Sequence, residues 1–257
     1  MTARAWAVVT AEFTKIRTVR STLWTFVLTF LVSAGIGLAL GLAVAHSFDG
    51  RTAEERASFD PVYTGFQGMV ISQIVLLVFG VLVVASEYSS GTIQPSLTAT
   101  PRRGLFYAGK IAVGTLLAAA VALLTSFVTF FAAQAALGAH GAGWGDPEVA
   151  RAVWGTAFYM TAMCAFAMGV TAMLRSSALS LSVLIPLFFI VSPILNAVPK
   201  VKSVARFLPD RAGIVLMRVV DRDDMAAYSV STAVAVLAVW TVLALAGGYA
   251  VLRVRDA

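Results

Sequence analysis

The stretch Glu87-Tyr-Ser-Ser-Gly-Thr-Ile-Gln-Pro-Ser-Leu-Thr-Ala-Thr-Pro-Arg-Arg103 is a polar interruption between two long apolar runs. Thr92 can cap the start of a helix. Pro95 then falls in the first turn, where its missing N–H loses no intrahelical bond, and Pro101 ends the helix. The pattern predicts a helix of about two turns. Isolated helices shorter than ~12 residues are not stable in water, so we expect this helix to dock against another surface.

The composition places the chain in a membrane. Its 257 residues are 59% hydrophobic and only 12% charged, far more apolar than an average soluble domain. The formal charge of +6 comes from basic residues in loops that flank apolar runs, which indicates membrane orientation and no nucleic-acid partner. The single cysteine, Cys164, lies inside an apolar run, so the chain forms no internal disulfide and no cysteine-based metal cluster.

Six apolar runs are each long enough to cross ~30 Å of hydrocarbon. We therefore predict an all-α integral membrane protein with one transmembrane domain, residues 1–257. Residues 1–22 carry Trp6 and Phe13 at helical spacing and Lys15 among the polar positions, which predicts an interfacial helix anchored by these three residues. Residues 199–227 alternate apolar and charged patches and are expected to lie along the outer interface. The predicted spans are 23–45, 62–86, 105–139, 150–174, 176–198 and 228–252, with the polar segment 87–104 between the second and third.

Six spans place both termini on one side of the membrane. With the termini in the cytoplasm, the cytoplasmic segments hold ten Lys and Arg residues, among them Arg102, Arg103 and Lys110, and the outer segments hold nine. Six of those nine belong to residues 200–222. Without that segment the count is ten against three, as the positive-inside rule requires. We therefore expect a multi-pass protein of the cytoplasmic (inner) membrane with both termini inside.

A few residues within the spans suggest packing or a pathway. Gly37 and Gly41 would allow two helices to approach closely, and Gln73 and Gln134 would hydrogen-bond between helices or contact a substrate. Pro186 and Pro193 should kink the span 176–198, because each removes a backbone hydrogen bond.

The sequence lacks the residues that several classes of protein function require. No Gly-x-x-x-x-Gly-Lys-Ser/Thr phosphate loop occurs, so this sequence does not supply an ATPase. The apolar cores of the six spans hold no ionisable side chain, which argues against a proton-coupled carrier, a voltage sensor or an intramembrane hydrolase. Asp221, Asp223 and Asp224 are expected to be solvated and metal-free, because Arg222 sits among them and no calcium-loop pattern surrounds them.

The polar segment resembles the membrane-spanning subunits of the type-2 family of ATP-binding-cassette exporters. Glu87, Tyr88, Gly91, Thr92, Pro101 and Arg103 match the family's Glu-Tyr-x-x-Gly-Thr motif and its Pro-x-Arg ending. Glu12-Phe13-Thr14-Lys15 also resembles the start of many such permeases. The resemblance implies that the short helix is a coupling helix lying in a groove of a separate ATPase, with Leu97 and Arg102 also at this contact.

The resemblance also implies partners and cofactors. Two ATPase subunits would bind ATP and Mg, this chain would bind no cofactor and catalyse no reaction, and a second permease chain would complete a homodimer in the lipid bilayer. A pathway without ionisable groups favours a hydrophobic or amphipathic substrate. Two simpler readings stay open: the polar segment is an ordinary turn carrying a capped helix, or the chain is a non-transporting membrane anchor or assembly factor that recruits a cytoplasmic protein through residues 87–103.

Overall fold

The computed structural model describes residues 2–18, 20–99, 102–220 and 228–254. Within these ranges all regular secondary structure is helical. The predicted all-α fold with six spans is confirmed, because six helices are long and apolar enough to cross a membrane. These are α2 (Arg20–Ser47), α4 (Pro61–Ser89), α6 (Arg103–Leu137), α7 (Val149–Leu174), the broken helix Ser177–Ala197 and α12 (Val230–Val254).

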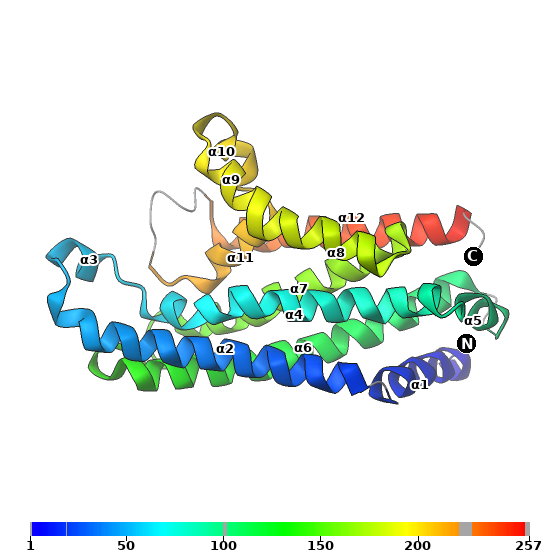
Figure 1. Cartoon of the computed structure of the whole chain (residues 1–257), viewed down its shortest axis with the longest axis horizontal. Helices are drawn as coiled ribbons and strands as arrows, with labels where there is room; N and C mark the ends of the chain where they lie inside the picture. Colours follow the sequence, from blue (N-terminus) through cyan, green and yellow to red (C-terminus); the bar gives the residue numbers. More distant parts are fainter. Residues whose placement is uncertain (1, 19, 100–101, 221–227, 255–257) are drawn as a thin grey trace.

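The long helices run side by side and define two ends of the bundle (Figure 1). The end that holds both chain termini is called the termini end here; α1 (Thr2–Thr18) and α5 (Ile93–Ala99) lie there. The opposite end is called the α3 end and carries η1 (Phe48–Gly50), α3 (Ala53–Ala57) and η2 (Gly138–His140). Both termini therefore lie on the same side of the bundle, as an even number of spans requires.

Helices α4 and α7 form the centre of the bundle. Helix α2 packs against α4 and α6, and α12 packs along α7. The apolar windows of α4 and α7 are mostly buried inside the chain (61% and 72%), whereas those of α2, the fifth span and α12 are only 17–28% buried. Apolar side chains exposed along a membrane-spanning helix need lipid or another protein against them, so these three helices form the outer faces of the chain.

Glycines bring α2 close to its neighbours. A Cβ on Gly37 would lie 2.7 Å from the carbonyl oxygen of Gly65 in α4, and one on Gly41 would lie 2.9 Å from that of Ala133 in α6. Only glycine permits such an approach. The small-residue face of α2 is therefore filled by helices of the same chain.

The fifth span is broken where the sequence has its prolines. It consists of α8 (Ser177–Pro186), the π-helical turn η3 (Leu187–Val191) and α9 (Ser192–Ala197), with Pro193 in the first turn of α9. Pro186 cannot donate a backbone hydrogen bond, and the wider π turn accommodates this loss. Helix α8 packs against α4 and α7, and Figure 1 shows α9 continuing toward α10 (Pro199–Ala205).

The segment between the last two spans has an exposed first part, α10, and a second part that is packed into the bundle. Helix α11 (Pro209–Met217) packs against α7 and α12. Leu216 and Met217 are fully buried, and Asp210 and Arg218 are buried although both are charged. Asp221, Asp223 and Asp224, for which we expected solvated charge, lie outside the described residues.

Candidate functional site

The polar segment at the termini end forms a tight turn and a seven-residue helix. Gly91 has a φ of +68°, a left-handed conformation that favours glycine, and it reverses the chain after α4. The carbonyl oxygen of Thr92 accepts the first helical bond from the N–H of Ser96 (3.1 Å). Ile93 is buried, while Gln94 and Pro95 are exposed. One side of α5 therefore holds to the bundle and another is open to a partner.

The other predicted contact residues lie around this helix. Tyr88 is half-buried, and the guanidinium of Arg175 lies 5.6 Å from its ring centroid. Arg102 is exposed, whereas Nη1 of Arg103 donates to the carbonyl oxygen of Leu252 (2.9 Å) and joins α6 to α12. For Leu97 the structure describes only the backbone, and Pro101 lies outside the described residues.

Four charged side chains meet directly beneath α5. We call Glu12, Lys15, Glu87 and Lys110 the charge cluster. Nζ of Lys110 lies 2.6 Å from Oε2 of Glu12 and 3.1 Å from Oε1 of Glu87. Nζ of Lys15 lies 2.9 Å from Oε1 of Glu12 and 2.8 Å from Oε1 of Glu87. The cluster joins α1, the end of α4 and the beginning of α6.

The cluster is balanced in charge and largely shielded from solvent. The side chains of Glu12, Glu87 and Lys110 are 3–6% exposed, and that of Lys15 is 48% exposed. Burial alone would raise the pKa of Glu12, but the nearby Lys110 and Lys15 outweigh it and hold that pKa below its ordinary value. Burial opposes the charge of Lys15, yet hydrogen bonds to Glu87 and Glu12 raise its pKa. These contacts thus favour the charged forms of Glu12 and Lys15.

The charge cluster links α5 to the rest of the bundle. Nζ of Lys15 also lies 3.5 Å from the hydroxyl of Ser96 in α5. A pocket of about 370 Å³ adjoins the cluster, with walls from α1, α2, α4 and α6. A displacement of α5 therefore bears on α1, α4 and α6 at the same place.

Sequence reasoning found part of this arrangement. It singled out Glu87 and Glu12-Phe13-Thr14-Lys15, but it treated Lys15 as a membrane anchor and Lys110 as an ordinary cytoplasmic charge. Lys110 is buried about two turns into α6. The available signal was its isolation: it is the only charged residue in the predicted span 105–139. Trp6 and Phe13 are exposed on α1, and their role as interfacial anchors stays a prediction.

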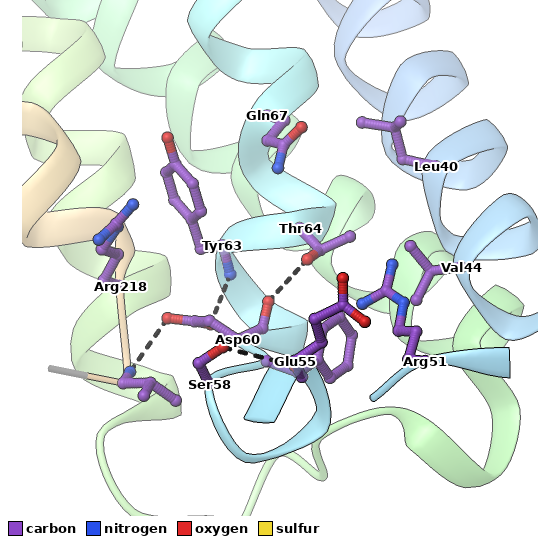
Figure 2. A pocket seen from close by; sticks show the side chains of 12 residues that line it. Leu40, Val44, Arg51, Glu55, Ser58, Asp60, Tyr63, Thr64, Gln67 and Arg218 are labelled. Atoms are coloured by element: carbon purple, nitrogen blue, oxygen red, sulfur yellow. Dashed lines mark hydrogen bonds between the residues drawn. The ribbon is translucent and has the colours of Figure 1, made fainter. Parts of the chain in front are cut away.

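A second polar site lies at the α3 end (Figure 2). Asp60 caps α4 by accepting a hydrogen bond from the N–H of Tyr63 (2.8 Å), and its Oδ2 accepts from the N–H groups of Val219 (2.9 Å) and Val220 (3.0 Å). The guanidinium of Arg218 stacks over the Tyr63 ring, 4.4 Å from its centroid. The adjoining pocket of about 450 Å³ also contains Arg51, Glu55 and Gln67. Asp60 therefore fastens the segment after α11 to the start of α4.

The two glutamines predicted for packing or a pathway differ. Gln134 is fully used within the chain: its Nε2 donates to the carbonyl oxygen of Pro61 (3.1 Å) and its Oε1 accepts from the N–H of Ala142 (2.8 Å). Gln73 is 2% exposed, and neither polar atom of its side chain has a hydrogen-bond partner among the described residues. Gln134 thus joins α6 to the start of α4 and to the loop after η2, whereas Gln73 lines a separate pocket.

These features define a class: a multi-pass membrane protein that presents a short helix at one end, braced from beneath by buried ion pairs. A comparison with family models matches residues 6–257 to the ABC-2 family transporter protein. The chain belongs to this family and is a membrane permease component of an ABC transporter. A comparison with curated proteins gives no match. Members of the family typically work with an ABC ATPase, which is therefore the kind of partner to expect.

Proposed function

We propose that the chain is the permease subunit of an ATP-driven exporter and that α5 is its coupling helix. The observation that carries this proposal is the charge cluster, which joins α1, α4 and α6 through contacts of 2.6–3.1 Å and reaches the short exposed helix through Nζ of Lys15, 3.5 Å from the hydroxyl of Ser96. A helix of seven residues has little stability alone, so its position depends on what it contacts on both sides.

The cluster suggests how motion would pass into the membrane. When a bound ATPase displaces α5, the turn at Gly91 pulls on the end of α4, and Ser96 moves relative to Lys15. Because Glu12 and Glu87 share both lysines, α1, α4 and α6 move together. Leaving one member behind would strand a buried charge, which costs several kcal/mol. The cluster therefore favours concerted displacement over the movement of one helix.

The ATPase would supply the nucleotide chemistry. We place ATP and Mg in that subunit, with two copies per transporter, and the termini end of the permease in the cytoplasm. The second permease chain would lie against an outer face of this one. The glycine face of α2 is already filled by helices of the same chain. We therefore assign the exposed side of α2 to lipid or to the second copy in a homodimer; this side carries Trp24, Leu28 and Leu31.

The proposed substrate is hydrophobic or amphipathic. Lys110, Glu87 and Arg151 are charged residues of the spans, but each lies near a helix end, and the middle of the spans offers apolar side chains, hydroxyls and amides. A small hydrophilic ion would lose its hydration there without compensation. In proteoliposomes with the ATPase, amphipathic compounds should stimulate ATP hydrolysis, and sugars and inorganic ions should not.

Complex formation tests the proposal. The double variant Thr92→Arg/Leu97→Glu, on α5 and the turn before it, should lose co-purification with the ATPase while the protein still inserts into the membrane. Ala57→Arg, exposed at the opposite end, is the matched control and should retain it. Equal co-purification of both variants with unchanged ATPase activity would exclude α5 as the contact.

The same experiments separate the alternative of a membrane anchor. An anchor would also bind its partner through the polar segment, but no compound would stimulate ATP hydrolysis by the complex. Stimulation by an amphipathic compound therefore supports export.

A further inference from the structure

The break in the fifth span borders a pocket that none of the described residues fills. It encloses about 240 Å³ between α4, α7, α11 and the π-helical turn η3. Pockets that hold a whole drug-sized ligand measure roughly 300–1,000 Å³, so this space suits one end of a ligand. Irregular backbone at membrane depth is tolerated where it is buried in protein or lines a cavity, and π turns often occur at functional sites. Phe188 and Phe189 of η3 form part of the wall.

The pocket contains a polar side chain whose hydrogen-bonding capacity is unused. Gln73 extends from the middle of α4, is 2% exposed, and among the described residues has no hydrogen-bond partner for either Nε2 or Oε1. Burying an amide without partners is costly in free energy, so such a group calls for an explanation. Gln134 shows that the same side chain in this bundle can be fully bonded. The cost at Gln73 is explained if a ligand supplies the missing partners.

A second unpartnered acceptor borders the same pocket. Oδ2 of Asp210 accepts a hydrogen bond from the hydroxyl of Ser192 (2.6 Å) and lies 3.1 Å from Nε of Arg211. Oδ1 of Asp210 is buried and has no hydrogen-bond partner in the part of the chain that the structure describes. Burial raises the pKa of Asp210, more than Ser192 and Arg211 lower it. A ligand anion would place another hydrogen-bond acceptor against Oδ1 of Asp210, whereas a ligand N–H or O–H group would donate the hydrogen bond that this oxygen lacks.

The other walls are aromatic and aliphatic except for Arg211, whose Nε donates to the hydroxyl of Ser192 (3.1 Å) and lies 3.1 Å from Oδ2 of Asp210. Tyr159 and Met163 of α7 and Met217 of α11 face the pocket together with Phe188 and Phe189. These side chains provide apolar contact beside the amide of Gln73. The arrangement therefore combines one donor, two acceptors and an apolar surround.

We propose that this pocket binds the polar end of an amphipathic substrate, an uncharged amide that accepts a hydrogen bond from Gln73 Nε2 and donates to Gln73 Oε1 or Asp210 Oδ1. This proposal extends the proposed function. Calling the ligand a substrate rests on that function, whereas binding of the ligand depends on this chain alone. The apolar body of the ligand extends past Phe188 and Phe189 toward the hydrocarbon.

Binding is tested on the full chain in lipid nanodiscs without an ATPase, so the result is independent of coupling. The probe is octanamide carrying a diazirine in its chain, and photo-crosslinked peptides are identified by mass spectrometry. Labelling should saturate and should concentrate on the segments that contain Phe188, Phe189 and Met217. Octanamide should compete with the probe. N,N-dimethyloctanamide, which lacks an N–H, should compete about tenfold more weakly, equivalent to the loss of one hydrogen bond of about 1.4 kcal/mol.

Two variants separate a binding role from a structural one. Gln73→Leu should raise the half-saturating probe concentration about tenfold and should also raise the unfolding temperature by ~2–4 °C, because it removes a buried amide without partners. Gln67→Leu makes the same change at an exposed position of α4 and should alter neither quantity. A stabilised Gln73→Leu protein with weakened binding is a combination that a purely structural glutamine does not produce.

Three results would overturn the proposal: non-saturating labelling spread over the lipid-facing helices, unchanged labelling of Gln73→Leu, or a Gln73→Leu protein that is less stable than the wild type. Competition by octanoate as strong as that by octanamide would overturn the assignment of an uncharged amide. If binding is found but the chain recruits no ATPase, the pocket stands and the proposed transport function fails.

Discussion

Lys110→Met tests whether the charge cluster holds α1 and α6 together. Lys110 has a 6% exposed side chain and lies 2.6 Å from Oε2 of Glu12 and 3.1 Å from Oε1 of Glu87. With an effective dielectric constant near 20, Coulomb's law gives roughly 6 kcal/mol for an ion pair at the shorter distance. Desolvation offsets much of this attraction, and removing one partner of a buried pair typically costs about 3–5 kcal/mol. We expect Lys110→Met to weaken the docking of α1 by that amount.

The assay follows the release of α1 with a cysteine at Ile16, which is 8% exposed, in a Cys164→Ala background. Where opening and closing are fast, the labelling rate by a soluble maleimide reports the population of the open state. A loss of about 3 kcal/mol corresponds to a rate increase above a hundredfold. Lys15→Met is the matched control: its side chain is 48% exposed, so solvent screening limits its cost to ~1 kcal/mol or less.

A double-mutant cycle isolates the pair. Glu12→Gln with Lys110→Met should cost at least ~1.5 kcal/mol less than the sum of the single changes, because neither partner is then left as an uncompensated charge. Additive effects, or equal acceleration in Lys110→Met and Lys15→Met, would refute the reasoning.

Three further outcomes are expected. Gly37→Leu should destabilise the chain by about 1–3 kcal/mol in detergent unfolding, because a Cβ at that position would lie 2.7 Å from the Gly65 carbonyl oxygen, whereas Gly35→Leu faces open space and should change little. Because the pKa of Glu12 is lowered in the folded state, its contribution to stability is complete above its unfolded-state pKa, near 4.5, and is lost as pH falls through the lower folded-state pKa. The unfolding temperature should therefore drop in that pH range, and it should drop less steeply in Glu12→Gln. Asp60→Ala should speed hydrogen exchange at the amides of Val219 and Val220 by more than tenfold, since charged hydrogen bonds are worth about 1.5–3 kcal/mol each; equal exchange would contradict the assigned contacts.

The spans could be predicted because length and polarity alone determine which segments can cross a bilayer. Runs without charge in the sequence correspond to α2, α4, α6, α7, the broken fifth span and α12. The charge cluster was harder to predict from the sequence. Glu12 and Lys110 are separated by 98 positions, and their contact depends on how α1 folds back onto α6.

The interior of the bundle shows the same limit. The prolines of the fifth span indicated a kink, but the π turn and the pocket beside it depend on how α11 packs. The pattern of residues 199–227 indicated a segment along the outer interface, yet the fold buries Asp210 and brings Ser192 to it. The polarity of Gln73 was visible in the sequence, and its lack of partners was not.

The central claim is that α5 contacts an ATPase, and a photo-crosslinking residue at Gln94 tests it most directly. Gln94 is on the exposed side of α5, whereas Glu54 is equally exposed at the opposite end. In native membranes, irradiation of the Gln94 variant should give a product that contains an ABC ATPase, identified by mass spectrometry, and the Glu54 variant should give none. An ATPase product from Glu54 alone, or none from Gln94 in a chain that is inserted and folded, would contradict the claim.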